Sequence, residues 1–202
     1  MSDKPLLIGI TGGIGSGKST VCKILETLGH QVYYADNRAK WLMANDEHLK
    51  KKIQSQFGEE VYKGGSLNRE YLAETVFHDK NKLEVLNGLV HPEVGADLRN
   101  WVASNNTEKL LFDEAALLFE AGSYKKMDKN ILVTAPEQLR IQRVLERDKH
   151  RTEKDVRAII AKQMTDEEKS TLADFIIVND GSQSIIAQTM QIREDLLAIH
   201  HK

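Results

Sequence analysis

A glycine-rich segment near the start of the chain has the spacing of a phosphate-binding loop. Residues 12–19 read Gly-Gly-Ile-Gly-Ser-Gly-Lys-Ser, which fits G-x-x-x-x-G-K-[ST] between the apolar run 6–10 and the helix-forming stretch 20–28. Glycines permit the backbone conformations that turn successive N–H groups toward an anion, and the start of a helix adds positive partial charge. The pattern predicts a cradle for nucleotide phosphates. A third glycine of G-x-G-x-x-G is missing, which disfavours a dinucleotide-binding fold.

Two side chains of this loop would act on the triphosphate directly. Lys18 brings a positive charge close to the β- and γ-phosphates, and Ser19 offers a hydroxyl to Mg²⁺. We therefore expect ATP and Mg²⁺ as cofactors and Lys18 as a catalytic residue. The alternative is a glycine-rich turn without a ligand, which the matching strand, loop and helix context disfavours. The expected nucleotide-binding residues are Gly13, Ile14, Gly15, Ser16, Gly17, Lys18, Ser19 and Thr20.

A carboxylate after the second apolar run is the candidate general base. Asp36 follows the run 31–35, and from there it could accept the proton of a substrate hydroxyl aligned on the γ-phosphate. Aspartate at a junction between a strand and a helix also commonly caps the helix. The sequence leaves both roles open, and one residue can perform both.

Arginines gather after the fourth apolar run. Arg140, Arg143, Arg147 and Arg151 recur at helical spacing, and Arg157 follows them. A guanidinium group can form two hydrogen bonds to one phosphate, which suits a lid that closes over ATP. We expect Arg143 and Arg147 to be the catalytic pair, with the next residue, an aspartate, orienting the second of them. The alternative is a solvated stripe paired with neighbouring acids.

Residues after the third apolar run are candidates for acceptor binding. Asp113 near the end of residues 110–114 resembles a metal-directed carboxylate of ATPases that activate water. The apolar continuation to Glu120 is more consistent with the lining of an acceptor pocket, to which Asp113, Leu118 and Glu120 would contribute. Alternatively, these carboxylates hold N–H groups of the loop.

Two further residues have weaker signals. His91 precedes a proline in a long helical pattern and could bring an imidazole to the acceptor, although a histidine in this setting is often structural. Asn179 begins an Asn-Asp-Gly turn after the last apolar run, where the backbone could contact the adenine edge or simply reverse the chain.

The elements that must position these residues follow an α/β pattern. Apolar runs typical of buried parallel strands alternate with helical sequence, which predicts a three-layer α/β/α fold with a five-stranded parallel sheet. In such sheets ligands bind beyond the carboxyl ends of the strands, where the loop 12–19, Asp36, Asp113 and Asn179 all fall. The predicted strands cover residues 6–11, 31–35, 109–115, 130–135 and 174–179.

We expect one domain over residues 1–202, with a helical acceptor-binding insert at 37–107 and a lid at 136–165. A purely structural insert is the alternative. Its pattern predicts no strand and helices at 37–44, 47–57, 69–76 and 80–104. Its expected small core comprises Trp41, Leu42, Leu49, Ile53, Phe57, Leu72, Val76 and Phe77.

The lid and the carboxyl-terminal region continue the helical pattern. The lid begins with a predicted helix over 137–149, and Thr152 with Asp155 resembles a capping box for a helix that ends near Met164. An amphipathic helix is expected over 182–200.

Composition limits the partners. The chain has 28 Lys and Arg against 30 Asp and Glu, a formal charge of -2, so we expect no nucleic-acid or membrane partner. The single cysteine, Cys22, suits a reducing compartment, and we expect a cytoplasmic location. The oligomeric state stays open between a monomer and a weak homo-oligomer.

Taken in order, these motifs resemble the dephospho-CoA kinase family over almost the whole chain. The resemblance implies a P-loop NTPase fold like that of nucleoside-monophosphate kinases, with a helical CoA-binding insert and an arginine-rich lid. It also implies transfer of the γ-phosphoryl group of ATP to the 3'-hydroxyl of dephospho-CoA, the last step of CoA synthesis. The segments that carry it are residues 8–19, Ala35-Asp36, Val90-His91-Pro92, residues 113–120, residues 142–148, Gln163 and residues 173–181.

The chain departs from that family at a few positions. Tyr34 stands where the family often has aspartate, and Ala116 stands where it usually has proline. Two alternatives stay open: another small-molecule kinase of the same fold that acts on a nucleoside or nucleotide, and a nucleotide-dependent regulatory switch. The absence of an Asn-Lys-x-Asp tetrapeptide weakens a GTPase switch.

Overall fold

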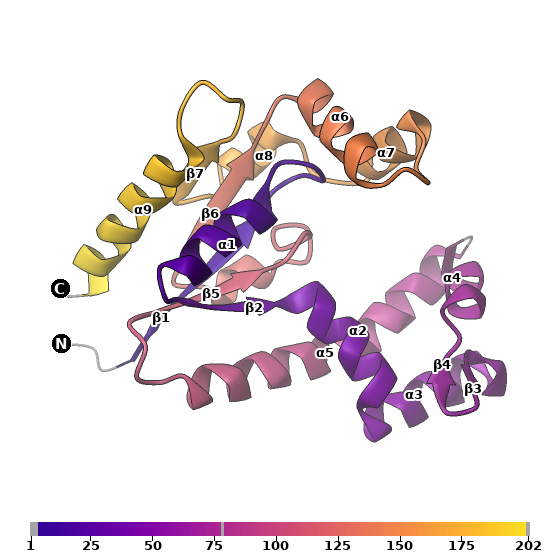
Figure 1. Cartoon of the computed structure of the whole chain (residues 1–202). Helices are drawn as coiled ribbons and strands as arrows, with labels where there is room; N and C mark the ends of the chain where they lie inside the picture. Colours follow the sequence, from indigo (N-terminus) through magenta and orange to yellow (C-terminus); the bar gives the residue numbers. More distant parts are fainter. Residues whose placement is uncertain (1–3, 78, 201–202) are drawn as a thin grey trace. The chain divides into compact units, whose positions relative to one another are not determined.

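Over residues 4–77 and 79–200, which the computed structural model describes, five parallel strands form one sheet (Figure 1). The strand order is β2-β5-β1-β6-β7, so β1 is central and the phosphate-binding loop leaves the middle of the sheet. Because all strands run parallel, their carboxyl ends meet at one edge. This confirms the predicted α/β class. The strands are β1 (Leu6–Thr11), β2 (Gln31–Tyr34), β5 (Leu110–Glu114), β6 (Lys129–Thr134) and β7 (Phe175–Val178).

Helices cover this sheet with a continuous apolar core. Helices α1 (Lys18–Thr27) and α9 (Ile185–His200) pack together on the sheet and bury Val21, Cys22 and Leu196 against its strands. Leu111 and Leu132, which alternate with the residues of that core along their strands, are also fully buried, so both faces of the sheet are covered. Ile186 of the predicted amphipathic helix is 54% exposed.

The segment after β6 has the predicted helix starts but differs from the prediction at the helix ends. Helices α6 (Glu137–Arg147) and α7 (Glu153–Ile160) begin where expected, and the capping box of Thr152 and Asp155 is confirmed. The expected helix end near Met164 is wrong, because α7 ends at Ile160. A second capping box at Thr165 then starts the separate helix α8 (Asp166–Ser170), which was not expected. A 3₁₀ turn, η2 (Ser123–Lys126), precedes β6.

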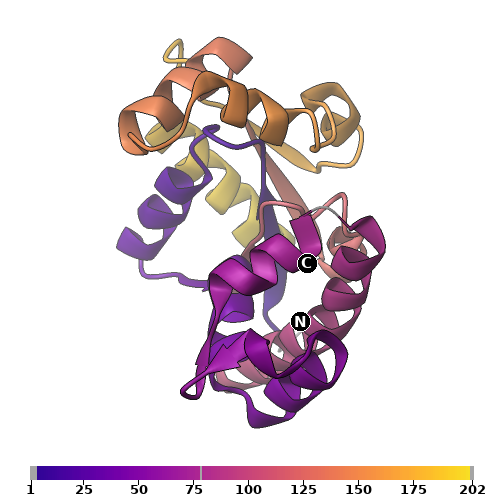
Figure 2. The same cartoon turned by 90° about the vertical axis from the view of Figure 1, so that its right-hand side faces the viewer.

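The chain divides into two compact units, and residues 35–103 form the second one. Its helices, drawn from purple to magenta in Figure 2, enclose their own core of Leu42, Leu49, Ile53, Phe57, Val61, Leu72, Leu86 and Val90. The predicted helices of the insert are confirmed as α2 (Ala35–Asn45), α3 (Glu47–Phe57), α4 (Arg69–Phe77) and α5 (Lys80–Ser104), with the 3₁₀ turn η1 (Glu59–Val61) after α3.

Two details of the second unit correct the prediction. A short hairpin, β3 (Tyr62–Lys63) and β4 (Ser66–Leu67), was not expected; Gly64 and Gly65 form its turn with φ values of 58° and 78°. Trp41 is 49% exposed and lies under the Arg38 guanidinium instead of in the core. The side chain of Phe77 lies outside the described residues.

Every helix in the described part of the chain is too short or too polar to span a membrane.

Candidate active site

The loop between β1 and α1 has the backbone that its glycines predict. Gly15 and Gly17 have φ values of 78° and 105°, a region that other residues rarely adopt. There is also no room for a side chain, because a Cβ on Gly15 would lie 2.4 Å from the Arg140 carbonyl oxygen. A Cβ on Gly17 would lie 2.2 Å from Nδ2 of Asn179. The loop is therefore packed tightly against Arg140 and Asn179.

The side chains of the loop and of the start of α1 differ in exposure. Lys18 folds back over the loop, and its Nζ donates to the carbonyl oxygens of Gly12 at 2.8 Å and Gly13 at 3.3 Å. Ser19 and Thr20 are exposed at the start of α1. Cys22, one turn later, is fully buried, and burial raises the pKa of its thiol. Cys22 is thus a neutral core residue at physiological pH.

A cleft of about 190 Å³ joins the loop to α6. It brings together the predicted phosphate-binding loop and the predicted arginine pair, although these lie more than a hundred residues apart in the chain. Three cationic side chains and the start of a helix converge there, which is an arrangement suited to a polyanion. The cleft is lined by Gly15, Gly17, Lys18, Ser19, Thr20, Arg143, Val144 and Arg147.

The remaining arginines have other partners. Arg140 is buried, and a Cβ on Gly13 would lie 1.8 Å from its Nη1, so the guanidinium rests directly on the loop. Arg151, beyond the end of α6, bonds to Asp148 at 2.7 Å. The expectation that Asp148 orients Arg147 is therefore wrong. Arg157 forms surface ion pairs with Glu137 and Glu153.

Asn179 holds the loop from the end of β7. Its Nδ2 donates to the Ser16 carbonyl oxygen at 2.8 Å, and its Oδ1 accepts from Nη2 of Arg143 at 3.5 Å. The sequence suggested a backbone contact to adenine or a plain turn for this residue. In the structure its side chain links the phosphate loop to one of the two arginines of the cleft.

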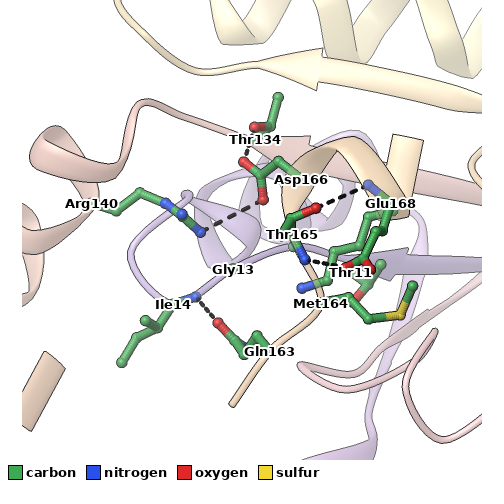
Figure 3. Close-up of polar contacts among 12 residues, drawn as sticks. Thr11, Gly13, Ile14, Thr134, Arg140, Gln163, Met164, Thr165, Asp166 and Glu168 are labelled. Atoms are coloured by element: carbon green, nitrogen blue, oxygen red, sulfur yellow. Dashed lines mark hydrogen bonds and ion pairs between the residues drawn. The ribbon is translucent and has the colours of Figure 1, made fainter. Parts of the chain in front are cut away.

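A second set of contacts holds the loop from the segment before α8, which is drawn in Figure 3. Oε1 of Gln163 accepts from the Ile14 N–H at 3.0 Å. Nη1 of Arg140 lies 3.6 Å from Oδ1 of Asp166, whose other oxygen accepts from the Thr134 hydroxyl. Sequence reasoning missed Asp166 and Thr134, and the capping box at Thr165 was the signal that could have located α8.

The predicted acceptor residues in and after β5 are mostly buried. Asp113 is 3% exposed and pairs in register with Gly9 and Tyr33. Leu118 is 1% exposed, and a Cβ on Gly9 would lie 2.5 Å from its Cδ2, so Leu118 packs on the central strand as a core residue. Glu120 accepts from the Met164 N–H at 3.0 Å.

The other two predicted residues lie in the second unit. Asp36 is exposed in the first turn of α2, which begins at Ala35. It therefore lies inside the helix and not at its cap. In this first turn, the negative charge of Asp36 complements the helix dipole. His91 is exposed in the middle of α5, directly before Pro92.

Within residues 4–77 and 79–200, no group of three or more His, Cys, Asp or Glu side chains could hold a metal ion by itself. Mg²⁺ at nucleotide sites needs no such group, because substrate phosphates and waters supply most of its ligands. The exposed Ser19 hydroxyl at the cleft is an oxygen donor of the type that Mg²⁺ accepts.

Comparison with known proteins identifies close relatives of this sequence. The sequence model of the dephospho-CoA kinase family matches residues 6–184. A dephospho-CoA kinase from Salinibacter ruber is 44% identical over 178 residues, which cover 87% of this chain and 89% of the relative. One from Bacteroides fragilis is 38% identical over 185 residues, with 92% and 90% covered.

Two solved structures have a similar fold over almost the whole chain. A protein from Thermus thermophilus superposes with a TM-score of 0.84 at 35% identity, covering 95% of this chain and 97% of that one. A dephospho-CoA kinase from Campylobacter jejuni superposes with a TM-score of 0.70 at 27% identity and the same coverage.

Proposed function

The chain belongs to the dephospho-CoA kinase family, and we infer that it transfers the γ-phosphoryl group of ATP to the 3'-hydroxyl of dephospho-CoA, giving CoA and ADP. This reaction is the last step of CoA biosynthesis. The observation that carries the proposal is the cleft in which the phosphate loop meets Arg143 and Arg147. We further propose a cytoplasmic enzyme that acts without a nucleic-acid partner, as a monomer or a weak homo-oligomer.

The donor side rests on the loop and on Lys18. Phosphoryl transfer requires alignment of the reactants and stabilisation of the charge on the transferring group. Backbone N–H groups from Gly13 to Thr20 would bind the phosphates. Lys18 would exchange the carbonyl oxygens of Gly12 and Gly13, its present partners, for phosphate oxygens. Because the ammonium already lies over the loop, this exchange needs only a side-chain movement.

Arg143 and Arg147 would bind the triphosphate from the other wall of the cleft. Both side chains come from α6, one turn apart, and so present two guanidinium groups to one ligand. A contact of 3.5 Å with Oδ1 of Asn179 would help to orient the Arg143 guanidinium. Their charge would stabilise the equatorial oxygens of the transferring group.

Mg²⁺ would be held by the Ser19 hydroxyl together with phosphate oxygens. When bound, it neutralises charge on the β- and γ-phosphates. Ser19 suits this role because it is exposed at the start of α1 and lines the cleft.

Asp36 would act on the acceptor side. The chain leaves the sheet at Tyr34 and reaches Asp36 two residues later, so the carboxylate is tethered to the carboxyl edge of β2. There it would orient the 3'-hydroxyl and accept its proton. We propose His91 and Asp113 as further residues of the acceptor side, with Leu118 supporting that side by packing on the sheet.

The test is a substrate panel. Purified protein is incubated with ATP, Mg²⁺ and dephospho-CoA, and CoA is detected by its mass, with nucleosides and nucleoside monophosphates as alternative acceptors. We expect CoA and ADP from dephospho-CoA and no product from the other acceptors. A preference for a nucleoside acceptor would indicate a different small-molecule kinase. ATP hydrolysis at a rate that no acceptor changes would favour a regulatory switch.

A further inference from the structure

The segment from Gln163 to Lys169 connects the phosphate loop to a buried ion pair. At one end, Gln163 accepts from the Ile14 N–H of the loop. The next residue, Met164, donates its N–H to Glu120, and Lys169 of α8 lies 3.1 Å from the same Glu120 oxygen, Oε1. A single carboxylate therefore anchors both ends of this segment.

The ion pair is unusually buried for its residue types. The Lys169 side chain is completely inaccessible, and that of Glu120 is 17% exposed. Lysine is almost never buried without a partner, because removal of its charge from water is costly. A buried pair of this kind contributes little more to stability than a well-packed apolar pair. Stability alone therefore does not explain why this pair lies next to the segment that contacts the phosphate loop.

The same segment reaches the loop by a second route. Asp166, at the start of α8, faces the Arg140 guanidinium, which rests on Gly13. Asp166 and Lys169 are three residues apart and lie on one side of α8. Displacement of α8 would thus move the contacts to both Gly13 and Ile14, since both depend on the position of residues 163–169.

We propose that Glu120 and Lys169 are positioning residues for phosphoryl transfer. Glu120 does not bind the acceptor; it holds Lys169 and the Met164 N–H so that Gln163 keeps the phosphate loop in the shape that receives ATP. This inference rests on the proposed function for the identity of the acceptor. Its central claim concerns ATP affinity and can be measured without an acceptor.

The experiment compares Glu120→Gln, Lys169→Met and the double variant. Each single change leaves one buried charge without its partner, and we expect it to weaken ATP binding about tenfold. In the double variant both groups are neutral and glutamine still accepts from Met164, so we expect much of the affinity to return. ATP affinity is measured by calorimetry without acceptor, and KM for dephospho-CoA is measured separately and should stay within about twofold.

Two further variants make the test specific. Gln163→Ala removes the contact to Ile14 and should weaken ATP binding alone, with no additional loss when it is combined with Glu120→Gln. Lys63→Met makes the same type of change in an ion pair whose side chains are more than 60% exposed, and it should change neither quantity. If the single variants of the buried pair fail to fold, the double variant and Gln163→Ala still test the link to the loop.

The outcomes separate the possibilities. A raised KM for dephospho-CoA with unchanged ATP affinity in Glu120→Gln would overturn the proposal and make Glu120 an acceptor contact. Lower melting temperatures with unchanged ATP affinity would overturn it in favour of a purely structural pair. Failure of the wild-type protein to phosphorylate dephospho-CoA would refute the proposed function. The measurements of ATP affinity would still test whether Glu120 and Lys169 position the phosphate loop.

Discussion

Asn179 donates a 2.8 Å hydrogen bond from its side chain to the Ser16 carbonyl oxygen, 163 residues away in the sequence. This contact holds the phosphate loop against the residue that follows β7. The side-chain oxygen of Asn179 accepts from Arg143 at 3.5 Å, so one amide contacts both the phosphate loop and helix α6. A residue that reads as a turn former in the sequence is therefore part of the support of the loop.

Replacement of this amide should weaken ATP binding. Asn179→Ala removes the bond to Ser16, and loss of one such bond, worth about 1 kcal/mol, corresponds to roughly a fivefold rise in the Kd for ATP. The matched control is Gln188→Ala, whose amide bonds to the backbone of Val178 but does not contact the loop. The control should lower stability and leave ATP affinity intact, as calorimetry and thermal melts will report.

Loss of the loop lysine should abolish most transfer. Lys18→Ala removes the ammonium that lies over the carbonyl oxygens of Gly12 and Gly13 and that would neutralise the triphosphate. We expect kcat to fall at least about a hundredfold in a coupled ADP assay, with an unchanged circular dichroism spectrum. Near-normal turnover would show that Lys18 does not stabilise the transferring group.

The role assigned to Asp36 predicts a loss in the chemical step alone. Asp36→Asn keeps the size of the side chain but cannot accept a proton, so kcat should fall about a hundred- to ten-thousandfold while ATP binding persists. Titration with ATP and single-turnover measurements distinguish these effects. If α2 melts or ATP no longer binds, the residue matters for the helix and not for proton transfer.

The arginines of α6 and α7 should differ sharply in effect. Arg147 lines the cleft, whereas Arg157 pairs with Glu137 and Glu153 at the surface. We expect Arg147→Ala to lower kcat/KM for ATP at least about tenfold. Arg157→Ala should leave both rate and melting temperature close to those of the wild type, because exposed ion pairs contribute little. If the two variants had equal effects, the claim that Arg147 acts on ATP and Arg157 does not would be wrong.

Acid should destabilise the protein through His30. Burial, and then the nearby Arg193 guanidinium, lower the pKa of His30 below its usual 6.5, and Arg193 donates to its Nε2 at 2.8 Å. The unfolded chain therefore binds this proton more readily than the folded protein does. The stability that His30 contributes is complete above pH 6.5 and declines as the pH falls from there toward the folded pKa.

The measurement for His30 is urea unfolding at a series of pH values across this range. His30→Gln cannot be protonated and can still accept from Arg193, so its free energy of unfolding should depend less on pH than that of the wild type. Parallel pH curves for the two proteins would mean that His30 does not titrate on unfolding.

Local patterns in the sequence determined the strands of the main sheet and the backbone of the phosphate loop, but not the β3/β4 hairpin or helix α8. The apolar runs became the strands of the sheet, and the loop 12–19 has the positive φ angles that its glycines predict. Both results follow from interactions within a few residues: burial of short apolar runs and the freedom of glycine. The capping box at Thr152 is a further case, since its hydrogen bonds span only three residues.

Only the tertiary structure decided which side chains share a site. Arg140, Arg143 and Arg147 look alike in the sequence, yet the first supports the loop from a buried position and the other two line the cleft. Glu120 reads as a ligand of the acceptor, and its buried lysine partner lies 49 residues away. Such assignments depend on contacts between segments that are far apart in the sequence. These contacts form only when the sheet assembles, so no local spacing of residues encodes them.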